Sequence, residues 1–359
     1  MSLELARPVR LSNLQKKFGT FQALKGISLD IEAGEFITFL GPSGCGKTTT
    51  LKIVSGLLTQ DSGEIFFDDR RVDQLPPNKR NIGLVFQNYA LFPHMTVREN
   101  VAFGLRMRGW SKSRQNERVD EMLALVRLQA MADRKPEQLS GGQQQRVAVA
   151  RALAFSPDLV LLDEPLSNLD AKLREEVRLD LRNIQRKSQQ TTIFVTHDQI
   201  EALVMSDRIV LMNAGQVEQV GSPKQLYNEP GTEFAARFVG ANNLVAAEIM
   251  RDGSKAVARV GGDVVVPLDT VAGNVGGQGS PIWLCIRPEH VEIVPERQAD
   301  AVCGATITDL VFQGTSVLIE LDAEALGPMR VELASHKVQD LEVDQRVGVS
   351  VTVAHAVAR

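Results

Sequence analysis

The sequence predicts an α/β domain built on a parallel sheet, followed by a smaller domain of β-strands. Up to about residue 240, short apolar runs alternate with longer stretches in which apolar residues recur at helical spacing. Beyond it, apolar and polar residues alternate over short segments punctuated by Gly and Pro. Residues 241–359 hold 9 Lys and Arg against 16 Asp and Glu, whereas residues 1–240 hold 31 against 28. We therefore expect domains at residues 1–240 and 241–359.

Composition argues against several classes of protein. The 359 residues are 43% hydrophobic and 23% charged, as in a globular protein of two domains. No apolar run approaches the roughly 20 residues that span a bilayer, and the first residues lack a continuous apolar stretch, so we expect neither a membrane span nor a secretory signal. Cys45, Cys285 and Cys303 are too widely spaced for a disulfide framework or a zinc site. A net charge of −4 argues against a nucleic-acid partner.

Periodicity predicts the main elements of both domains. Four apolar runs that lead into polar loops predict buried parallel strands: Phe36–Leu40, Ile82–Phe86, Leu159–Leu162 and Thr192–Thr196. Helical spacing predicts helices through Val119, Met122, Leu123 and Val126, and through Leu173, Val177, Leu181 and Ile184. In the second domain, strict alternation predicts strands through Ile282, Leu284 and Ile286, and through Val347, Val349, Val351 and Val353. Such strands form a small antiparallel barrel, OB-like, or a sandwich.

A glycine-rich loop follows the first apolar run and has the pattern of a phosphate-binding site. Its residues match G-x-x-x-x-G-K-[ST] and are Gly41, Pro42, Ser43, Gly44, Cys45, Gly46, Lys47 and Thr48, with Thr49 next. Glycines let the backbone turn its N–H groups toward phosphates, and a helix beginning near Lys47 adds its positive end. We expect Lys47 to reach the β- and γ-phosphates of ATP, and Thr48 to offer its hydroxyl to Mg²⁺.

Two carboxylates end the apolar run at residues 159–162. Asp163 and Glu164 would be delivered to the sheet edge where the phosphate loop lies. We expect Asp163 to hold Mg²⁺ and Glu164 to polarise the water that attacks the γ-phosphate. Taken alone, the pair could also simply end a strand and cap the next helix. The phosphate loop in the same domain favours the catalytic interpretation.

A third motif precedes the acidic strand and consists of Leu139, Ser140, Gly141, Gly142 and Gln143. Ser-Gly-Gly alone is common as a plain helix cap. In this order, however, the three motifs resemble those of the ABC ATPases, and the resemblance covers residues 8–240. It implies an α/β P-loop nucleotide-binding cassette with a helical subdomain at about residues 91–157. In that family the third motif, the signature, contacts ATP held by a second cassette, which implies a head-to-tail homodimer.

Smaller elements match the same family in order. Gln87 occupies the place of the Q-loop glutamine, which would sense Mg²⁺ and the attacking water, and His197 that of the switch histidine at the γ-phosphate. The segment that matches the D-loop, which faces the partner cassette, is Ser167, Asn168, Leu169 and Asp170. Asn168 differs from the alanine found there in many cassettes. Phe18 takes the place of the aromatic residue that stacks on adenine, and the alternative is a core phenylalanine.

Further segments resemble one importer subgroup that carries a C-terminal TOBE domain. They are Leu75-Pro76-Pro77, residues 85–97, Arg287-Pro288-Glu289-His290 and Gln313-Gly314-Thr315. The resemblance implies ATP and Mg²⁺ as cofactors, integral-membrane permease subunits and an extracytoplasmic solute-binding protein as partners, and a peripheral location on the cytoplasmic face of the cell membrane. Members energise uptake of polyamines, ferric iron, sulfate, phosphonates and sugars. Residues 238–244 favour polyamine, with ferric iron and phosphonate as alternatives.

Cassettes with this signature also serve in DNA repair and translation, which gives a class of rival functions. Repair cassettes insert long coiled coils between the phosphate loop and the signature, and this chain has no sustained heptads there. Translation-factor cassettes usually carry two copies in one chain, and this chain carries one. The transport interpretation is therefore favoured.

Overall fold

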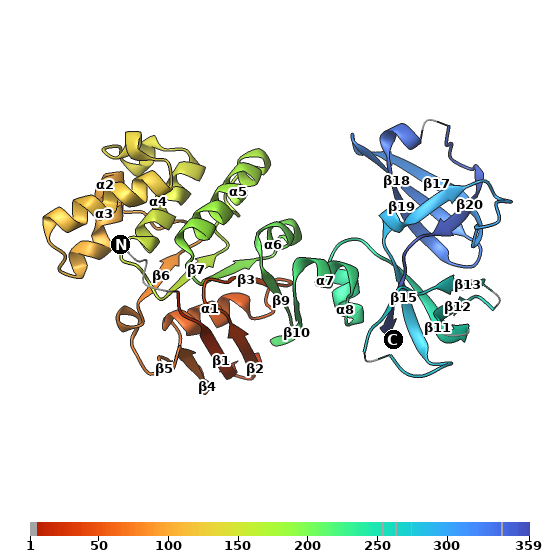
Figure 1. Ribbon diagram of the computed structural model, residues 1–359, viewed down its shortest axis with the longest axis horizontal. Helices are drawn as coiled ribbons and strands as arrows, with labels where there is room; N and C mark the ends of the chain where they lie inside the picture. The colour runs from red at the N-terminus through yellow and green to blue at the C-terminus, as the bar shows by residue number, and fades with distance from the viewer. Residues whose placement is uncertain (1–5, 253–254, 263, 274, 339) are drawn as a thin grey trace. The chain divides into compact units, whose positions relative to one another are not determined.

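The computed structural model describes residues 6–359 except 253–254, 263, 274 and 339. The chain divides into two compact units, Met1–Pro223 and Lys224–Arg359 (Figure 1). This division lies before Gly240, where the charge pattern predicts the boundary. The short helices α7 (Pro223–Asn228) and α8 (Glu233–Phe238) are tied to the β-strands that follow, because the buried guanidinium of Arg287 donates to the carbonyl of Val239 at 2.6 Å.

The first unit is organised by a six-stranded sheet whose strand order is β10-β9-β3-β8-β7-β6. The strands are β3 (Phe36–Leu40), β6 (Ile82–Val85), β7 (Leu159–Asp163), β8 (Thr192–Thr196), β9 (Arg208–Asn213) and β10 (Gln216–Gly221). All neighbours pair in parallel except β10 with β9. The four predicted parallel strands are confirmed, with Phe86 falling outside β6. Their carboxyl ends lie at one edge, which brings the loops of three motifs together.

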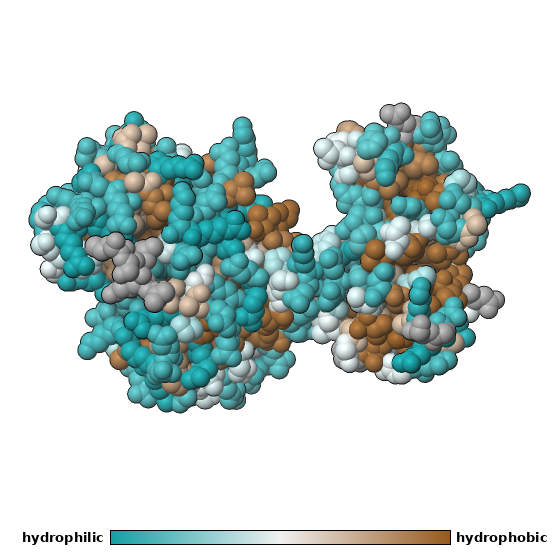
Figure 2. All heavy atoms as spheres, in the orientation of Figure 1, coloured by the Kyte–Doolittle hydropathy of each residue, from teal (hydrophilic) through white to brown (hydrophobic). Residues whose placement is uncertain are grey.

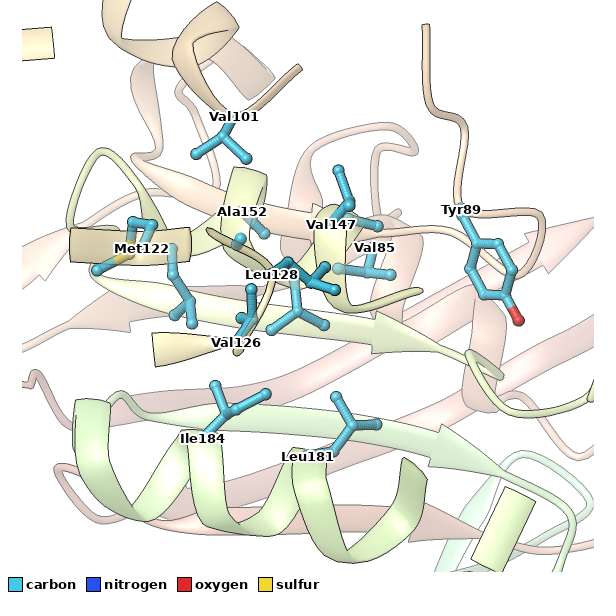
Figure 3. Close-up of a cluster of buried hydrophobic side chains, with 14 of the residues drawn as sticks. Val85, Tyr89, Val101, Met122, Val126, Leu128, Val147, Ala152, Leu181 and Ile184 are labelled. Carbon is cyan, nitrogen blue, oxygen red and sulfur yellow. The ribbon is translucent and has the colours of Figure 1, made fainter. Parts of the chain in front are cut away.

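Both faces of this sheet are covered. On one face, α1 (Lys47–Ser55) packs with an antiparallel sheet of strand order β2-β1-β4-β5. These strands are β1 (Val9–Phe18), β2 (Phe21–Ile31), β4 (Ser62–Phe67) and β5 (Arg70–Arg71). On the other face lie α4 (Gly141–Leu153) and α5 (Ala171–Ser188), and Figure 3 shows Leu181 and Ile184 of α5 pointing toward the strands. The helix α6 (Gln199–Met205) follows β8.

A helical region separates β6 from β7, where the subdomain is predicted. It consists of α2 (Val97–Met107), α3 (Lys112–Leu125) and α4. Thr96 and Glu99 form a reciprocal capping box at the start of α2, and Ser111 caps α3. The predicted periodic residues Val119, Met122 and Leu123 of α3 are all buried in the core shared with α4, and so is Val126, which follows the helix. Figure 3 shows Met122 and Val126 in this core. Short 3-10 helices occur at Pro77–Lys79, Gln129–Met131, Pro136–Gln138, Pro288–His290 and Ser335–Lys337.

The described strands of the second unit form two sheets around one hydrophobic core, rather than one closed barrel. One sheet contains β11 (Asn243–Asp252), β12 (Lys255–Val260), β13 (Val264–Pro267), β14 (Thr270–Val271), β15 (Pro281–Ile286) and β21 (His355–Ala358). The other contains β16 (Val291–Val294), β17 (Cys303–Phe312), β18 (Ser316–Ala323), β19 (Gly327–Ala334) and β20 (Arg346–Val351). Val353 lies outside a strand, so the predicted alternation from Val347 to Val353 is wrong in its last step, because β20 ends at Val351.

The surface of the first unit is mainly hydrophilic in Figure 2, and hydrophobic residues gather there over α5 and α6. Leu179 of α5 and Ile200 and Val204 of α6 are exposed. In the described part of the chain, no helix is both long enough and apolar enough to cross a membrane.

Candidate functional site

The phosphate loop connects β3 to α1 in a conformation that requires glycine. Gly41 has φ of +155° and Gly46 has φ of +108°, a region that other residues rarely adopt. A Cβ on Gly41 would lie 2.2 Å from the carbonyl oxygen of Met212, and one on Gly46 would lie 2.7 Å from a methyl of Leu24. The loop therefore requires glycine at both positions, because of the backbone torsion and because neighbouring atoms leave no room for a Cβ.

Lys47, the first residue of α1, folds its side chain back into this loop. Its ammonium donates to the carbonyl oxygens of Gly41 at 2.7 Å and Pro42 at 3.0 Å, and lies 3.8 Å from the sulfur of Cys45. Lys47 is only 5% exposed, and Cys45 only 2%. The two carbonyls carry no net charge and form no ion pair with the ammonium, which stays available to pair with an anion bound in the loop.

Asp163 and Thr48 meet where β7 ends beside α1. The Thr48 hydroxyl lies 3.4 Å from Oδ1 of Asp163. Burial, and then the neighbouring carboxylate of Glu164, raise the pKa of Asp163, whereas the Thr48 hydroxyl and the cations of Lys52 and Lys47 oppose that rise. A half-buried carboxylate beside a hydroxyl is the hard-oxygen donor set that Mg²⁺ prefers, so these residues fit the predicted metal.

Glu164 and His197 form a second pair of polar side chains in the site, a carboxylate beside an imidazole. Oε2 of Glu164 lies 3.3 Å from Nδ1 of His197, and the two come from the ends of neighbouring strands β7 and β8. Glu164 adopts a left-handed backbone with φ of 43°, and its N–H donates to the Val195 carbonyl at 3.0 Å. Such a torsion is costly for a non-glycine residue and is typical of functional sites. Both side chains line a small cavity of about 70 Å³.

Gln87 is joined to Glu164 through Ser167. Nε2 of Gln87 donates to the Ser167 hydroxyl at 3.0 Å, and that hydroxyl donates to the backbone carbonyl of Glu164 at 2.9 Å. The direction of this chain follows from its last acceptor, because a carbonyl can only accept. Since Nε2 is used, the amide oxygen of Gln87 is the atom left for Mg²⁺ or for water. The predicted catalytic residues Glu164, His197 and Gln87 are thus brought together at one sheet edge.

The signature residues build the start of α4. Ser140 accepts from the N–H of Gln143 at 3.4 Å, and the Gln143 side chain accepts from the N–H of Ser140 at 3.0 Å. Gly142 is buried, and a Cβ on it would lie 2.8 Å from a methyl of Val177 in α5. Gly141 similarly faces Leu169 of the predicted D-loop, since its Cβ would lie 2.9 Å from that side chain. The two glycines therefore lie against α5 and the predicted D-loop, while Leu139 packs into the core of the helical region.

Phe18 is an exposed residue at the end of β1. It is 48% exposed, and the ammonium of Lys16 lies 5.7 Å from the centre of its ring. The alternative of a core phenylalanine is therefore wrong. An exposed aromatic face remains available for an adenine base.

The sequence did not predict a polar cluster behind His197. The Thr196 hydroxyl donates to Oε2 of the buried Glu201 at 2.6 Å and accepts from the N–H of Asp198 at 3.0 Å. Arg174 of α5 lies 3.7 Å from Asp198. The cluster flanks His197 on both sides along the chain and holds its loop. Thr196, Asp198 and Glu201 lie within six residues and Asp198 caps α6, which is a local signal, whereas the contact with Arg174 depends on how α5 and α6 meet.

Comparison with known proteins agrees with this geometry. The pattern described as ABC transporter matches residues 24–167, and that described as TOBE domain matches residues 284–358. The spermidine/putrescine import ATP-binding protein PotA of Roseobacter denitrificans is 44% identical over 339 residues, which are 94% of this chain and 93% of that protein. The Fe(3+) ions import ATP-binding protein FbpC of Fusobacterium nucleatum is 45% identical over 307 residues, 85% of this chain and 81% of that protein.

Solved structures give the same result for the first unit. A dimer of the ATP-binding cassette MJ0796 bound to ADP and Pi is 36% identical, with a TM-score of 0.52, over 60% of this chain and 98% of that chain. The phosphate loop, the acidic strand end and the signature helix define an ATP-binding ATPase cassette. The chain belongs to the ABC transporter family, as an ATPase of the importer type with a C-terminal TOBE domain. The predicted family, fold class and enzyme class are confirmed.

Proposed function

We propose that this chain hydrolyses ATP as a head-to-tail homodimer and thereby drives solute uptake through separate membrane-embedded subunits. The observation that carries the proposal is the hydrogen-bonded chain from Gln87 through Ser167 to Glu164, with His197 at 3.3 Å from the Glu164 carboxylate. It lies at the strand ends beside the phosphate loop, where a γ-phosphate would be held.

Each residue then has a distinct task. The loop N–H groups and Lys47 bind the phosphates, and Phe18 stacks on the base. Glu164 accepts the proton of the attacking water, and His197 donates a hydrogen bond to the γ-phosphate and keeps Glu164 oriented. Thr48, Asp163 and the amide oxygen of Gln87 would hold Mg²⁺. When bound, Mg²⁺ supplies positive charge that neutralises the phosphate oxygens as negative charge develops on the leaving group.

The dimer is supported by the position of the signature. Ser140 is exposed at the start of α4, where free N–H groups and the helix dipole suit an anion. An anion bound there would belong to a second copy, because the phosphate loop serves the nucleotide of its own cassette. The MJ0796 cassette, which covers 60% of this chain, is a dimer with ADP and Pi. Ser167, Asn168, Leu169 and Asp170 would face that second copy.

A transport ATPase of this kind works with integral-membrane permease subunits and, indirectly, an extracytoplasmic solute-binding protein, from the cytoplasmic face of the cell membrane. We propose a polyamine as the solute. The spermidine/putrescine relative supports it because the similarity spans 94% of this chain. Ferric iron is the second candidate, supported by a relative that is 45% identical over 85% of the chain.

The hydrolytic assignment is tested with Glu164→Gln. Glutamine keeps the shape of the side chain and its contact with His197 but cannot take a proton, so kcat should fall by about 10²- to 10⁴-fold while ATP binding persists. ATP turnover and binding of a fluorescent ATP analogue are measured on the purified chain. Glu176→Gln, an exposed carboxylate of α5, is the matched control and should behave as wild type. Turnover of Glu164→Gln within threefold of wild type would refute the assignment.

The solute is tested by uptake of labelled spermidine and ferric iron in cells that lack the gene. Spermidine uptake that falls in these cells and returns with wild type, but not with Glu164→Gln, supports the polyamine proposal. The same pattern for ferric iron alone would replace it with the second candidate. Uptake of both solutes at normal rates would contradict both.

A further inference from the structure

Asn168 makes a side-chain contact that an alanine at its position could not make. Its side-chain amide donates to the backbone carbonyl of Gln87 at 2.9 Å. Alanine, which many ABC cassettes have there, has no donor to offer. We propose that Asn168 is a positioning residue that ties the Q-loop to the D-loop within one cassette. This inference rests on the proposed roles of Gln87 and of the D-loop.

Gln87 is therefore held at both of its polar ends by consecutive residues. Ser167 accepts from the Gln87 side-chain amide at 3.0 Å, and Asn168 donates to the Gln87 main-chain carbonyl at 2.9 Å. One hydrogen bond alone would let the residue pivot about it. Two bonds from adjacent residues fix both its backbone and the direction in which its free amide oxygen points.

The segment after Gln87 is held from a different element. Tyr89 and Ala90 have φ of 60° and 46°, a left-handed conformation that is unfavourable for residues other than glycine and persists only where the surroundings enforce it. Arg151 of α4 enforces it, because its guanidinium donates to the carbonyls of Tyr89 at 2.8 Å and Ala90 at 2.7 Å. The Q-loop thus has one anchor on α4, the signature helix, and one on the D-loop.

The hydrogen bond from Asn168 of the D-loop is the weaker of the two anchors, and it is the one that a partner cassette could displace. Asn168 is exposed and makes a single bond between uncharged groups, whereas the bonds from Arg151 are charge-assisted. A second cassette that pressed on the D-loop would move Asn168, and the carbonyl of Gln87 would follow it. Closure of the dimer would then place Gln87 for hydrolysis through a bond made inside each cassette.

The test compares Asn168→Ala and Asn168→Asp with wild type, each alone and in a Gln87→Ala background. Aspartate keeps the size but has no donor at neutral pH. Loss of one uncharged hydrogen bond predicts a roughly two- to tenfold fall in kcat, with KM for ATP changed less than twofold. In the Gln87→Ala background the same substitutions should have no further effect. Glu176→Gln serves again as the control, and the melting temperature of each variant is measured.

Three outcomes would overturn the proposal. Normal kcat in Asn168→Ala, with Gln87→Ala impaired, shows that Gln87 does not need this bond, and it leaves the proposed function intact. An equal loss in wild-type and Gln87→Ala backgrounds, or a loss that tracks a lowered melting temperature, shows a general structural role. Full activity of Gln87→Ala removes the proposed role of Gln87 and this inference with it.

Discussion

Arg287 is expected to be a main determinant of stability in the second unit. It is 1% exposed, and its guanidinium donates to the carbonyls of Val239 at 2.6 Å, Ala241 at 3.0 Å and Tyr227. It also lies 3.8 Å from the centre of the Tyr227 ring. One buried cation thus holds the residues around α7 and α8 to the end of β15.

The perturbation is Arg287→Met, which keeps an unbranched side chain and removes every donor. It leaves three carbonyls without this partner; an unsatisfied buried acceptor costs about 1–3 kcal/mol, so the low end of that range for three acceptors gives a loss of about 3–5 kcal/mol. For a unit of this size, each kcal/mol corresponds to about 3 °C, so we expect its melting temperature to fall by roughly 9–15 °C. Burying methionine in place of the guanidinium offsets part of this loss, which favours the lower end of the range.

The assay follows unfolding by tryptophan fluorescence in a Trp110→Phe background, since the chain has two tryptophans and Trp283 is the one in the second unit. Arg330→Met is the matched control. Arg330 is 60% exposed on its side chain and pairs with Glu320 at 3.2 Å, and a surface pair of this kind contributes about 0–1 kcal/mol. A shift for Arg287→Met no larger than the shift for Arg330→Met would refute the reasoning.

Two further predictions concern the cassette. Gly142→Ala would put a Cβ 2.8 Å from Val177, and overpacking of this kind costs about 1–3 kcal/mol. It should displace the start of α4, so we expect a more than tenfold fall in kcat with ATP binding retained. Full activity at an unchanged melting temperature would contradict this prediction. Burial raises the pKa of Asp163, so the folded state binds this proton more tightly than the unfolded state does. The free energy of unfolding therefore falls as pH rises from the ordinary pKa of an aspartate through the raised pKa of the folded state. Asp163→Asn should therefore melt higher than wild type at pH 7.5 in EDTA, with a smaller difference at pH 4.5. A lower melting temperature at pH 7.5 would contradict this sign.

Much of the cassette could be predicted because its signals are local. Buried parallel strands are continuous apolar runs, and Phe36–Leu40 and Thr192–Thr196 were predicted to the residue. The phosphate loop depends on the torsions of Gly41 and Gly46, which the residue type itself permits. The order of the strand ends then implied that Asp163, Glu164 and His197 meet.

The second unit was harder to predict, because its burial pattern depends on packing. Cys285 interrupts the expected alternation of β15, since it is buried against Ala236 of α8 on the face opposite the main core. The role of Arg287 was likewise invisible, as its acceptors are backbone carbonyls that any residue at those positions would supply. The four-residue motif that begins at Arg287 was noted in the sequence, but it did not predict these hydrogen bonds.

The sequence by itself determined the fold class and the phosphate loop and predicted the catalytic side chains, because periodicity, glycine content and motif order are properties of neighbouring residues. Only the tertiary structure decided how those side chains are held. The hydrogen bonds that Gln87 forms with Ser167 and Asn168 join residues about 80 positions apart, and those from Arg151 to Tyr89 and Ala90 join residues about 60 apart. Such contacts depend on how β6, β7 and α4 pack, which no local pattern encodes.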